Sequence, residues 1–472
     1  MRSRWSVSRR EFLGATASTM GALAFSMAAR TVAAPPSPQA ARKAKSVVHK
    51  VYLAKPVPTW PCPDIDLAAE VRKLDAILED LRAQCGRPVE LVGGELLRTT
   101  EDLPAFQAKL GEVDGLLVFN LTSGVGRLLE AILGMGYPTV LFSQPYSGHD
   151  WSWIGQRTAR GDRVDVVSSS DFEDLLPYLR IFDAIRRVRQ TTILCIRQNR
   201  EKDDFSRQLE QHYGVKVIFP GYHELKKAFE RADTRRAAEL ADPFIARAIR
   251  MVEPSRTDVV NSMRLYLAVC ELLREYDAEV ITIDCLGGFQ RGDLPAYPCV
   301  AWTLLNNAGQ IGVCEADLAS TMTQILGQYL TGKPGFVSDP VIDTKTNTVI
   351  HAHCVAATRM DGPDGPEAPY LIRTHMEDNK GVSLQVKMRI GQAITLAKLA
   401  DVNTMILSTG EIIDNPDGPR GCRTKVATKV ADADRMLHNY RGGLHRLLFY
   451  GDHVGDFVKL GRLIGYRTEM EM

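Results

Sequence analysis

The alternation of short apolar runs with helical patterns through residues 46–340 restricts the fold of this chain more than any other feature of its sequence. The apolar run at residues 115–120 is followed by a helical pattern at 128–133 and by a second apolar run at 138–142. Short, wholly apolar runs are typical of strands that are buried on both faces of a parallel sheet. Strand, helix and strand in this order predict a doubly wound α/β layer.

The same alternation starts again after a helical pattern at residues 175–188. The strands predicted in this second unit are residues 191–196, 215–219 and 280–283. From about residue 348 short β-like runs dominate, which predicts an antiparallel sheet or barrel. We therefore predict an α/β fold with two doubly wound, Rossmann-like domains at residues 46–175 and 176–340, followed by a β-rich, barrel-like C-terminal domain at residues 341–472. The length of 472 residues agrees, because it exceeds what one hydrophobic core usually holds.

The N-terminus has the three parts of an export signal in order. Arg9 and Arg10 lie in a twin-arginine motif, an apolar stretch of small residues follows at 14–29, and a cleavage site is offered at 31–34. The stretch is a poor membrane span, and no cysteine follows it to carry a lipid anchor. We predict a twin-arginine signal peptide at residues 1–34, a Pro-rich basic linker at 35–45, and a periplasmic or extracellular product without a membrane anchor.

Charge and cysteine content exclude several classes of protein. The formal net charge of +1 gives no electrostatic reason to expect nucleic acid as a partner, and it suits a small neutral substrate. The nine cysteines are odd in number, sparse, and include no CxxC pair. They therefore predict buried apolar thiols rather than a disulfide framework or a structural zinc site.

A first carboxylate stands where α/β sheets place their ligands. Glu315 follows an apolar run at residues 311–314 and precedes a helical pattern at 318–330, so it lies at the carboxyl end of a predicted strand. The alternative is that an acid here only complements the helix dipole. Asp317 is better placed for that role, which leaves Glu315 as the candidate for chemistry.

A second carboxylate, Asp339, ends the apolar run at residues 335–339. We predict that the intervening helix and loop form a crossover to a neighbouring parallel strand, which would place Glu315 and Asp339 side by side at one sheet edge. An Asp-Pro turn is the alternative explanation for Asp339, and Asp317 and Asp343 remain competing acids.

Histidines supply a third ingredient. His351 and His353 lie on a predicted strand and share one face, because side chains alternate along a strand. His445 precedes another apolar run, at residues 447–450. Two carboxylates with one or two imidazoles form an oxygen-rich set that suits Mn²⁺ better than Zn²⁺, with Mg²⁺, Co²⁺ and Fe²⁺ as further possibilities.

Several short motifs occur in one order over the last 190 residues or so of the chain. They are Asp284-Cys285, Asn306-Asn307-Ala308-Gly309, Val313-Cys314-Glu315-Ala316-Asp317, Gln328-Tyr329-Leu330-Thr331-Gly332-Lys333-Pro334, Ser338-Asp339, His353-Cys354, Arg373-Thr374-His375, Gly421-Cys422-Arg423-Thr424, and His445 to Asp452. With these motifs the chain resembles the L-fucose isomerase and L-arabinose isomerase superfamily.

The resemblance implies a function and roles for residues. It implies that Glu315, Asp339 and His445 hold a divalent cation, usually Mn²⁺, and that Glu315 and Asp339 are catalytic. His353 and Arg373 are the residues we assign to the substrate side. The implied reaction is a metal-dependent aldose–ketose isomerisation of a monosaccharide through a cis-enediol intermediate, an intramolecular oxidoreduction, in a symmetric homo-oligomer.

Two other classes of function remain open on the same scaffold, because a fold does not determine an activity. One is an exported, noncatalytic sugar-binding protein. The other is a related carbohydrate epimerase or lyase, since enediolate chemistry serves those reactions with the same metal ligands.

Overall fold

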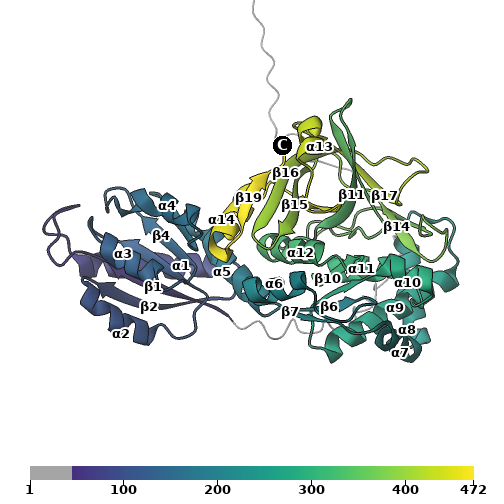
Figure 1. Cartoon of the computed structure of the whole chain (residues 1–472), viewed down its shortest axis with the longest axis horizontal. Helices are drawn as coiled ribbons and strands as arrows, with labels where there is room; N and C mark the ends of the chain where they lie inside the picture. Colours follow the sequence, from purple (N-terminus) through teal and green to yellow (C-terminus); the bar gives the residue numbers. More distant parts are fainter. Residues whose placement is uncertain (1–44) are drawn as a thin grey trace, which may run out of the picture. The chain divides into compact units, whose positions relative to one another are not determined.

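The computed structural model describes residues 45–472 (Figure 1). The predicted signal peptide, and the predicted linker except for Lys45, lie outside the described residues. Within the described range, no helix is both long enough and apolar enough to cross a membrane.

The first sheet is parallel and five-stranded, with the order β2-β1-β3-β4-β5. Its strands are β1 (Ser46–Leu53), β2 (Val89–Leu97), β3 (Gly115–Asn120), β4 (Thr139–Ser143) and β5 (Val164–Ser168), and the helices of this region are α1 (Leu67–Gln84), α2 (Leu103–Lys109), α3 (Gly126–Leu133), α4 (Ile154–Ala159) and α5 (Leu176–Arg189). Every residue of β3 and β4 is buried, as their apolar sequences predict. β2 and β5 have more polar sequences and were not predicted.

The second sheet is parallel and four-stranded, with the order β10-β9-β6-β7. Its strands are β6 (Thr192–Ile196), β7 (Lys216–Ile218), β9 (Val280–Ile283) and β10 (Ile311–Cys314), and the helices of this region are α6 (Asp204–Tyr213), α7 (Tyr222–Arg231), α8 (Thr234–Arg247), α9 (Arg256–Glu275), α10 (Cys285–Arg291), α11 (Cys299–Asn307) and α12 (Leu318–Thr331). One apolar core runs from the first sheet into the second, because Phe182, Ile185 and Val188 of α5 belong to the same buried cluster as residues of both sheets.

The C-terminal region contains a closed six-stranded antiparallel barrel, which confirms the barrel-like prediction. The strands follow the order β15-β18-β11-β12-β17-β16, and pairing between β15 and β16 closes the ring. They are β11 (Phe336–Asp343), β12 (Thr348–His353), β15 (Ala393–Asp401), β16 (Thr404–Asp414), β17 (Thr424–Val430) and β18 (Arg446–Tyr450), accompanied by α13 (Ala433–Asn439), α14 (Val454–Ile464) and β19 (Arg467–Met470). β19 joins β16 in parallel outside the ring.

The predicted crossover after Glu315 is wrong. β11, which carries Asp339, does not join the parallel sheet beside β10 but pairs antiparallel with β12 and β18 in the barrel. The reason is that β11 finds its hydrogen-bonding partners in later segments, and the 14-residue helix α12 connects two sheets rather than two strands of one. The boundary predicted between residues 340 and 341 therefore falls inside a strand.

Two of the β-like runs in the C-terminal half lie outside the barrel. β13 (Tyr370–Arg373) and β14 (Ser383–Val386) form a three-stranded sheet with β8 (Arg250–Met251), which follows α8. β8 is extended because it pairs with β13, a contact between residues about 120 positions apart that no local pattern reveals.

Candidate active site

Glu315 occupies a strained turn between β10 and α12. Glu315 and Ala316 have φ angles of 66° and 51°, a left-handed conformation that costs a non-glycine residue about 1–2 kcal/mol. Such strain persists where the surroundings enforce it, and it concentrates at functional sites. Asn306 supplies part of that enforcement, because its amide side chain exchanges two hydrogen bonds with the backbone of Gly312 in β10.

The barrel register explains why Asp339 and His445 meet. In the antiparallel pair β11–β18, Ser338 lies opposite Arg446, so Asp339 lies opposite His445. Residues that lie opposite one another across antiparallel strands point to the same side. His445 Nε2 is 3.2 Å from Asp339 Oδ1 and 3.4 Å from Glu315 Oε2. Glu315, Asp339 and His445, which are separated by up to 130 positions, thus converge as predicted.

Solvent reaches the carboxylates but hardly reaches the imidazole. The side chains of Glu315 and Asp339 are 29% and 32% exposed, whereas that of His445 is 7% exposed. Burial alone would raise the pKa of Glu315, but hydrogen bonding to His353 and His445 lowers it to about 2. Glu315 is therefore ionised throughout the neutral pH range.

Asp317 binds the ring nitrogen of His445 that faces away from Glu315 and Asp339. The Asp317 carboxylate accepts a hydrogen bond from His445 Nδ1 at 2.8 Å, which leaves Nε2 to face Glu315 and Asp339. Asp317 also accepts from the backbone N–H of Ser320 at the start of α12, so it is the helix cap that the sequence predicted. A carboxylate behind a histidine is the arrangement that orients metal-binding imidazoles in proteins.

Lys398 completes this arrangement, and the sequence analysis did not identify it. Its ammonium group, on β15, is 2% exposed and donates to Asp317 Oδ2 at 3.0 Å and to Ser320 Oγ at 2.9 Å. Burial raises the pKa of Asp317, but its hydrogen bond with His445 and the charge of Lys398 hold it well below its usual range. The single available signal was a lysine within an apolar run, and its partner lies 81 positions away.

His353 reaches the same cluster from β12. Its Nε2 lies 3.5 Å from Glu315 Oε1, and its side chain is 2% exposed. His353 Nδ1 accepts the backbone N–H of Cys354 at 2.9 Å, so in the neutral ring the proton resides on Nε2. His353 is close enough to Glu315 and His445 to form a possible ligand group with them, and the proton on its Nε2 would have to leave before that nitrogen could bind a cation.

Arg373 is not brought to the cluster. Its guanidinium group, at the end of β13, donates to Glu253 and to Gln385, and within residues 45–472 no hydrogen bond joins it to Glu315, Asp339 or His445. The predicted substrate-side role for Arg373 therefore receives no support from its contacts.

The donor set fits a divalent cation. Nε2 of His445 is buried and has no hydrogen-bond partner in the described part of the chain, although two carboxylates face it. Burial disfavours the charged ring, but Asp317, Asp339 and Glu315 together raise the pKa of His445 to about 10. The surroundings therefore favour positive charge at Nε2. Neighbouring ligands about 2.1 Å from one octahedral cation are about 3 Å apart, close to the two separations measured from His445 Nε2. The three ligand atoms that all lie within 4.8 Å of one another belong to Glu315, His353 and His445.

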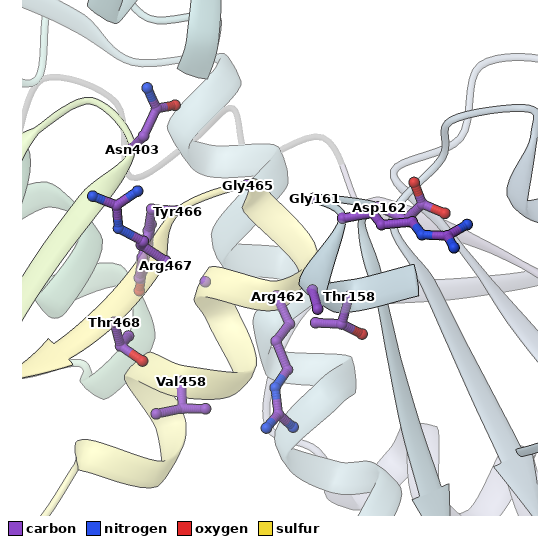
Figure 2. Close-up of a pocket in the computed structure, with 13 residues that line it drawn as sticks. Thr158, Gly161, Asp162, Asn403, Val458, Arg462, Gly465, Tyr466, Arg467 and Thr468 are labelled. Atoms are coloured by element: carbon purple, nitrogen blue, oxygen red, sulfur yellow. The ribbon is translucent and has the colours of Figure 1, made fainter. Parts of the chain in front are cut away.

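A separate pocket of about 480 Å³ lies away from this cluster (Figure 2). It is lined by Thr158 to Asp162, at the end of α4 and just after it, and by residues of α14 and β19, including Arg462 and Arg467. None of the predicted site residues lines it. Arg462 Nη1 is instead 2.9 Å from Asp165, an ion pair between α14 and β5.

Comparison with known proteins gives three relatives of one name, and no family model matches the chain. The sulfoquinovose isomerase of Clostridium sp. (strain MSTE9) is 25% identical over 257 residues, which cover 51% of this chain and 54% of the relative. The sulfoquinovose isomerases of Priestia aryabhattai and Priestia megaterium (strain ATCC 12872 / QMB1551) are each 23% identical over 185 residues, covering 38% of this chain and 41% of each relative.

The matched region thus spans about half the length of these curated relatives, or less. All three names denote a sugar isomerase, which agrees with the class of enzyme that the sequence motifs imply. Membership of the L-fucose and L-arabinose isomerase superfamily stays a prediction. The chain is therefore similar, at low identity, to curated sugar isomerases.

Proposed function

We propose that this chain is a metal-dependent aldose–ketose isomerase of the L-fucose and L-arabinose isomerase superfamily, acting on a monosaccharide through a cis-enediol. One observation carries the proposal. Glu315, Asp339 and His445 converge from distant segments, and the buried Nε2 of His445, which faces both carboxylates, has no hydrogen-bond partner within residues 45–472. The similarity to sulfoquinovose isomerases supports the same class of reaction.

In this proposal Glu315, Asp339 and His445 hold Mn²⁺ or another divalent cation such as Mg²⁺, Co²⁺ or Fe²⁺. When bound, the cation would polarise the substrate carbonyl and lower the barrier to removing the neighbouring C–H proton. Asp317 fixes the tautomer of His445, so that Nε2 and not Nδ1 faces the two carboxylates.

The protein's own residues move the protons. Isomerisation transfers one proton from C2 to C1 and one from the C2 hydroxyl to the C1 oxygen, so it needs no external oxidant. Glu315, ionised and partly exposed, takes the proton from one carbon, and Asp339 or Glu315 itself returns a proton to the other. The His353 Nε2–H is placed to donate a hydrogen bond to a substrate oxygen beside Glu315.

The remaining expectations belong to the same proposal. We propose export through the twin-arginine pathway to the periplasm or beyond, a route that suits a chain that takes up its metal before it is exported. We also propose a closed homo-oligomer, the usual form of such enzymes.

The proposal is tested by incubating the full chain with Mn²⁺ and sugars in deuterium oxide. Sulfoquinovose is the first substrate, because the relatives are named for it, and a panel of other aldoses follows. We expect ketose formation together with deuterium uptake at C2 of the recovered aldose. Deuterium uptake with an epimer or an eliminated product would indicate the epimerase or lyase, and sugar binding without any exchange would indicate the noncatalytic protein.

The carboxylate behind His445 gives a second expected result. In the double variant Asp317→Asn, Lys398→Met, both buried charges are removed together, so no unpaired charge is left in the protein interior. Asparagine also remains a good helix cap. We expect Mn²⁺ to bind the double variant about 10- to 100-fold more weakly than the single variant Lys398→Met, because a neutral amide orients and polarises His445 less.

Isothermal titration of the metal-free full chain with Mn²⁺ measures both affinities. The matched control is Lys398→Met alone, which keeps the Asp317–His445 hydrogen bond. Equal affinities for the two variants would contradict the assignment of Asp317 as the residue that positions His445.

A further inference from the structure

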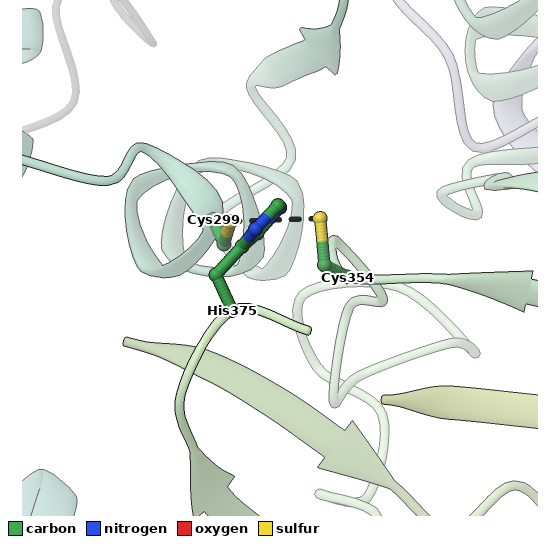
Figure 3. A group of neighbouring side chains, drawn as sticks. All are labelled: Cys299, Cys354 and His375. Carbon is green, nitrogen blue, oxygen red and sulfur yellow. Dashed lines mark hydrogen bonds between the residues drawn. The ribbon is translucent and has the colours of Figure 1, made fainter. Parts of the chain in front are cut away.

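Three buried side chains from separate segments lie together beside the cluster of Glu315, Asp339 and His445. Cys299 begins α11, Cys354 directly follows β12, and His375 lies two residues after β13. All three residues are at least 95% buried. Figure 3 shows the imidazole of His375 reaching between the two thiols.

The geometry brings three potential ligand atoms together. Cys299 Sγ and Cys354 Sγ are 3.5 Å apart, and a ring nitrogen of His375 lies within 4.8 Å of both sulfurs. Two thiolates and an imidazole around one tetrahedral cation, at about 2.3 Å for sulfur and 2.0 Å for nitrogen, are separated by about 3.5–3.8 Å. The observed cluster is therefore close to the spacing that a shared cation requires.

Two further observations favour a ligand over chance packing of thiols. Nδ1 of His375 is buried without a hydrogen-bond partner among residues 45–472, and the Asp378 carboxylate lies 3.8 Å from it, beyond hydrogen-bond distance. A third thiol, Cys314, lies within 4.8 Å of the Cys354 sulfur. Cysteines that the sequence predicted to be separate, apolar thiols are thus brought together in the tertiary structure.

We propose that Cys299, Cys354 and His375 form a second cation site, specific for a thiophilic metal such as Zn²⁺. Sulfur and imidazole ligands select such metals, whereas the oxygen-rich cluster around Glu315 selects hard cations. Two thiolates neutralise a dication, which reduces the cost of burying it. The bound metal ties the start of α11 to the end of β12, and so it anchors the segment that carries His353.

The proposal is tested with Co²⁺, which reports on thiolate ligands through a charge-transfer band in the near ultraviolet. The metal-free, reduced full chain is titrated with Co²⁺. We expect one equivalent to produce the band in the wild-type chain and in Glu315→Gln, whose altered cluster offers no sulfur. We expect the band to be lost in Cys299→Ser and in Cys354→Ser, and weakened in His375→Gln.

Cys195→Ser is the matched control, because it also places a serine hydroxyl in the protein interior. Cys195 lies in β6, is fully buried, and belongs to none of these ligand groups, so the band should persist in this variant. His375→Gln leaves both thiols in place and tests the site if a serine variant fails to fold. Absence of the band in the folded wild-type chain, its persistence in both serine variants, or a Cys299–Cys354 disulfide in the native protein would overturn the proposal.

Discussion

Glu315→Gln is expected to lower kcat by about 10³- to 10⁴-fold while the fold remains intact, because an amide cannot accept the proton that Glu315 removes in the proposed reaction. Glutamine has the same shape as glutamate and meets the same left-handed strain at φ 66°, so the substitution changes chemistry rather than backbone geometry. The loss should appear in kcat more than in KM if Glu315 acts mainly in the transition state. Steady-state kinetics with Mn²⁺ and the sugar that the wild-type chain converts measures it.

Asp343→Asn is the matched control. Asp343 lies on β11 with Asp339, is exposed, and accepts hydrogen bonds from the backbone of its own turn. This variant should keep wild-type kinetics. An active Glu315→Gln variant with an unchanged circular dichroism spectrum would remove Glu315 from the catalytic scheme, whereas an inactive one that has lost its structure would require Glu315→Asp as a second test.

Glu471→Ala is expected to lower the free energy of unfolding by about 3–5 kcal/mol, because it leaves a buried guanidinium group without its counter-charge. The side chains of Arg446 and Glu471 are 1% and 0% exposed, and Arg446 donates to Glu471 from Nη2 at 2.6 Å and from Nε at 3.2 Å. Arg446 directly follows His445. The pair therefore also fixes the start of the strand that brings His445 to the cluster.

The control for this prediction lies two residues away. Glu469 pairs with Arg467 and Arg441 on the surface and is 33% exposed, so Glu469→Ala should change stability by about 0–1 kcal/mol. Equilibrium urea denaturation followed by circular dichroism measures both variants. A Glu471→Ala variant as stable as Glu469→Ala would show that the buried pair contributes little.

Local patterns predicted the individual elements well where the hydrophobic signal was strong. The strands predicted at residues 115–120 and 280–283 match β3 and β9, and the helical pattern at 128–133 lies within α3. Their burial depends on periodicity within a few residues, which the sequence displays directly. Strands with mixed or polar composition, such as β2 and β15, were not predicted, because their burial depends on partner strands far along the chain.

The sequence named the candidate residues of the site but not the contacts that bring them together. Glu315, Asp339 and His445 were identified from motifs, and they do converge. The supporting residue Lys398 and the Cys299–Cys354–His375 cluster have no local signature, since their contacts join separate segments of the chain. Such contacts depend on strand register and on loop closure, neither of which a short motif encodes.

The sequence by itself determined where the strongly apolar strands and helices lie, and it supplied the carboxylates and imidazoles whose chemistry suits a divalent cation. The tertiary structure alone decided that Asp339 enters an antiparallel barrel instead of the sheet that presents Glu315, and that Arg373 pairs with Glu253 instead of facing the cluster. The physical reason is that hydrophobic periodicity is a property of neighbouring residues, whereas the choice of strand partner is made among all exposed strand edges when the chain collapses.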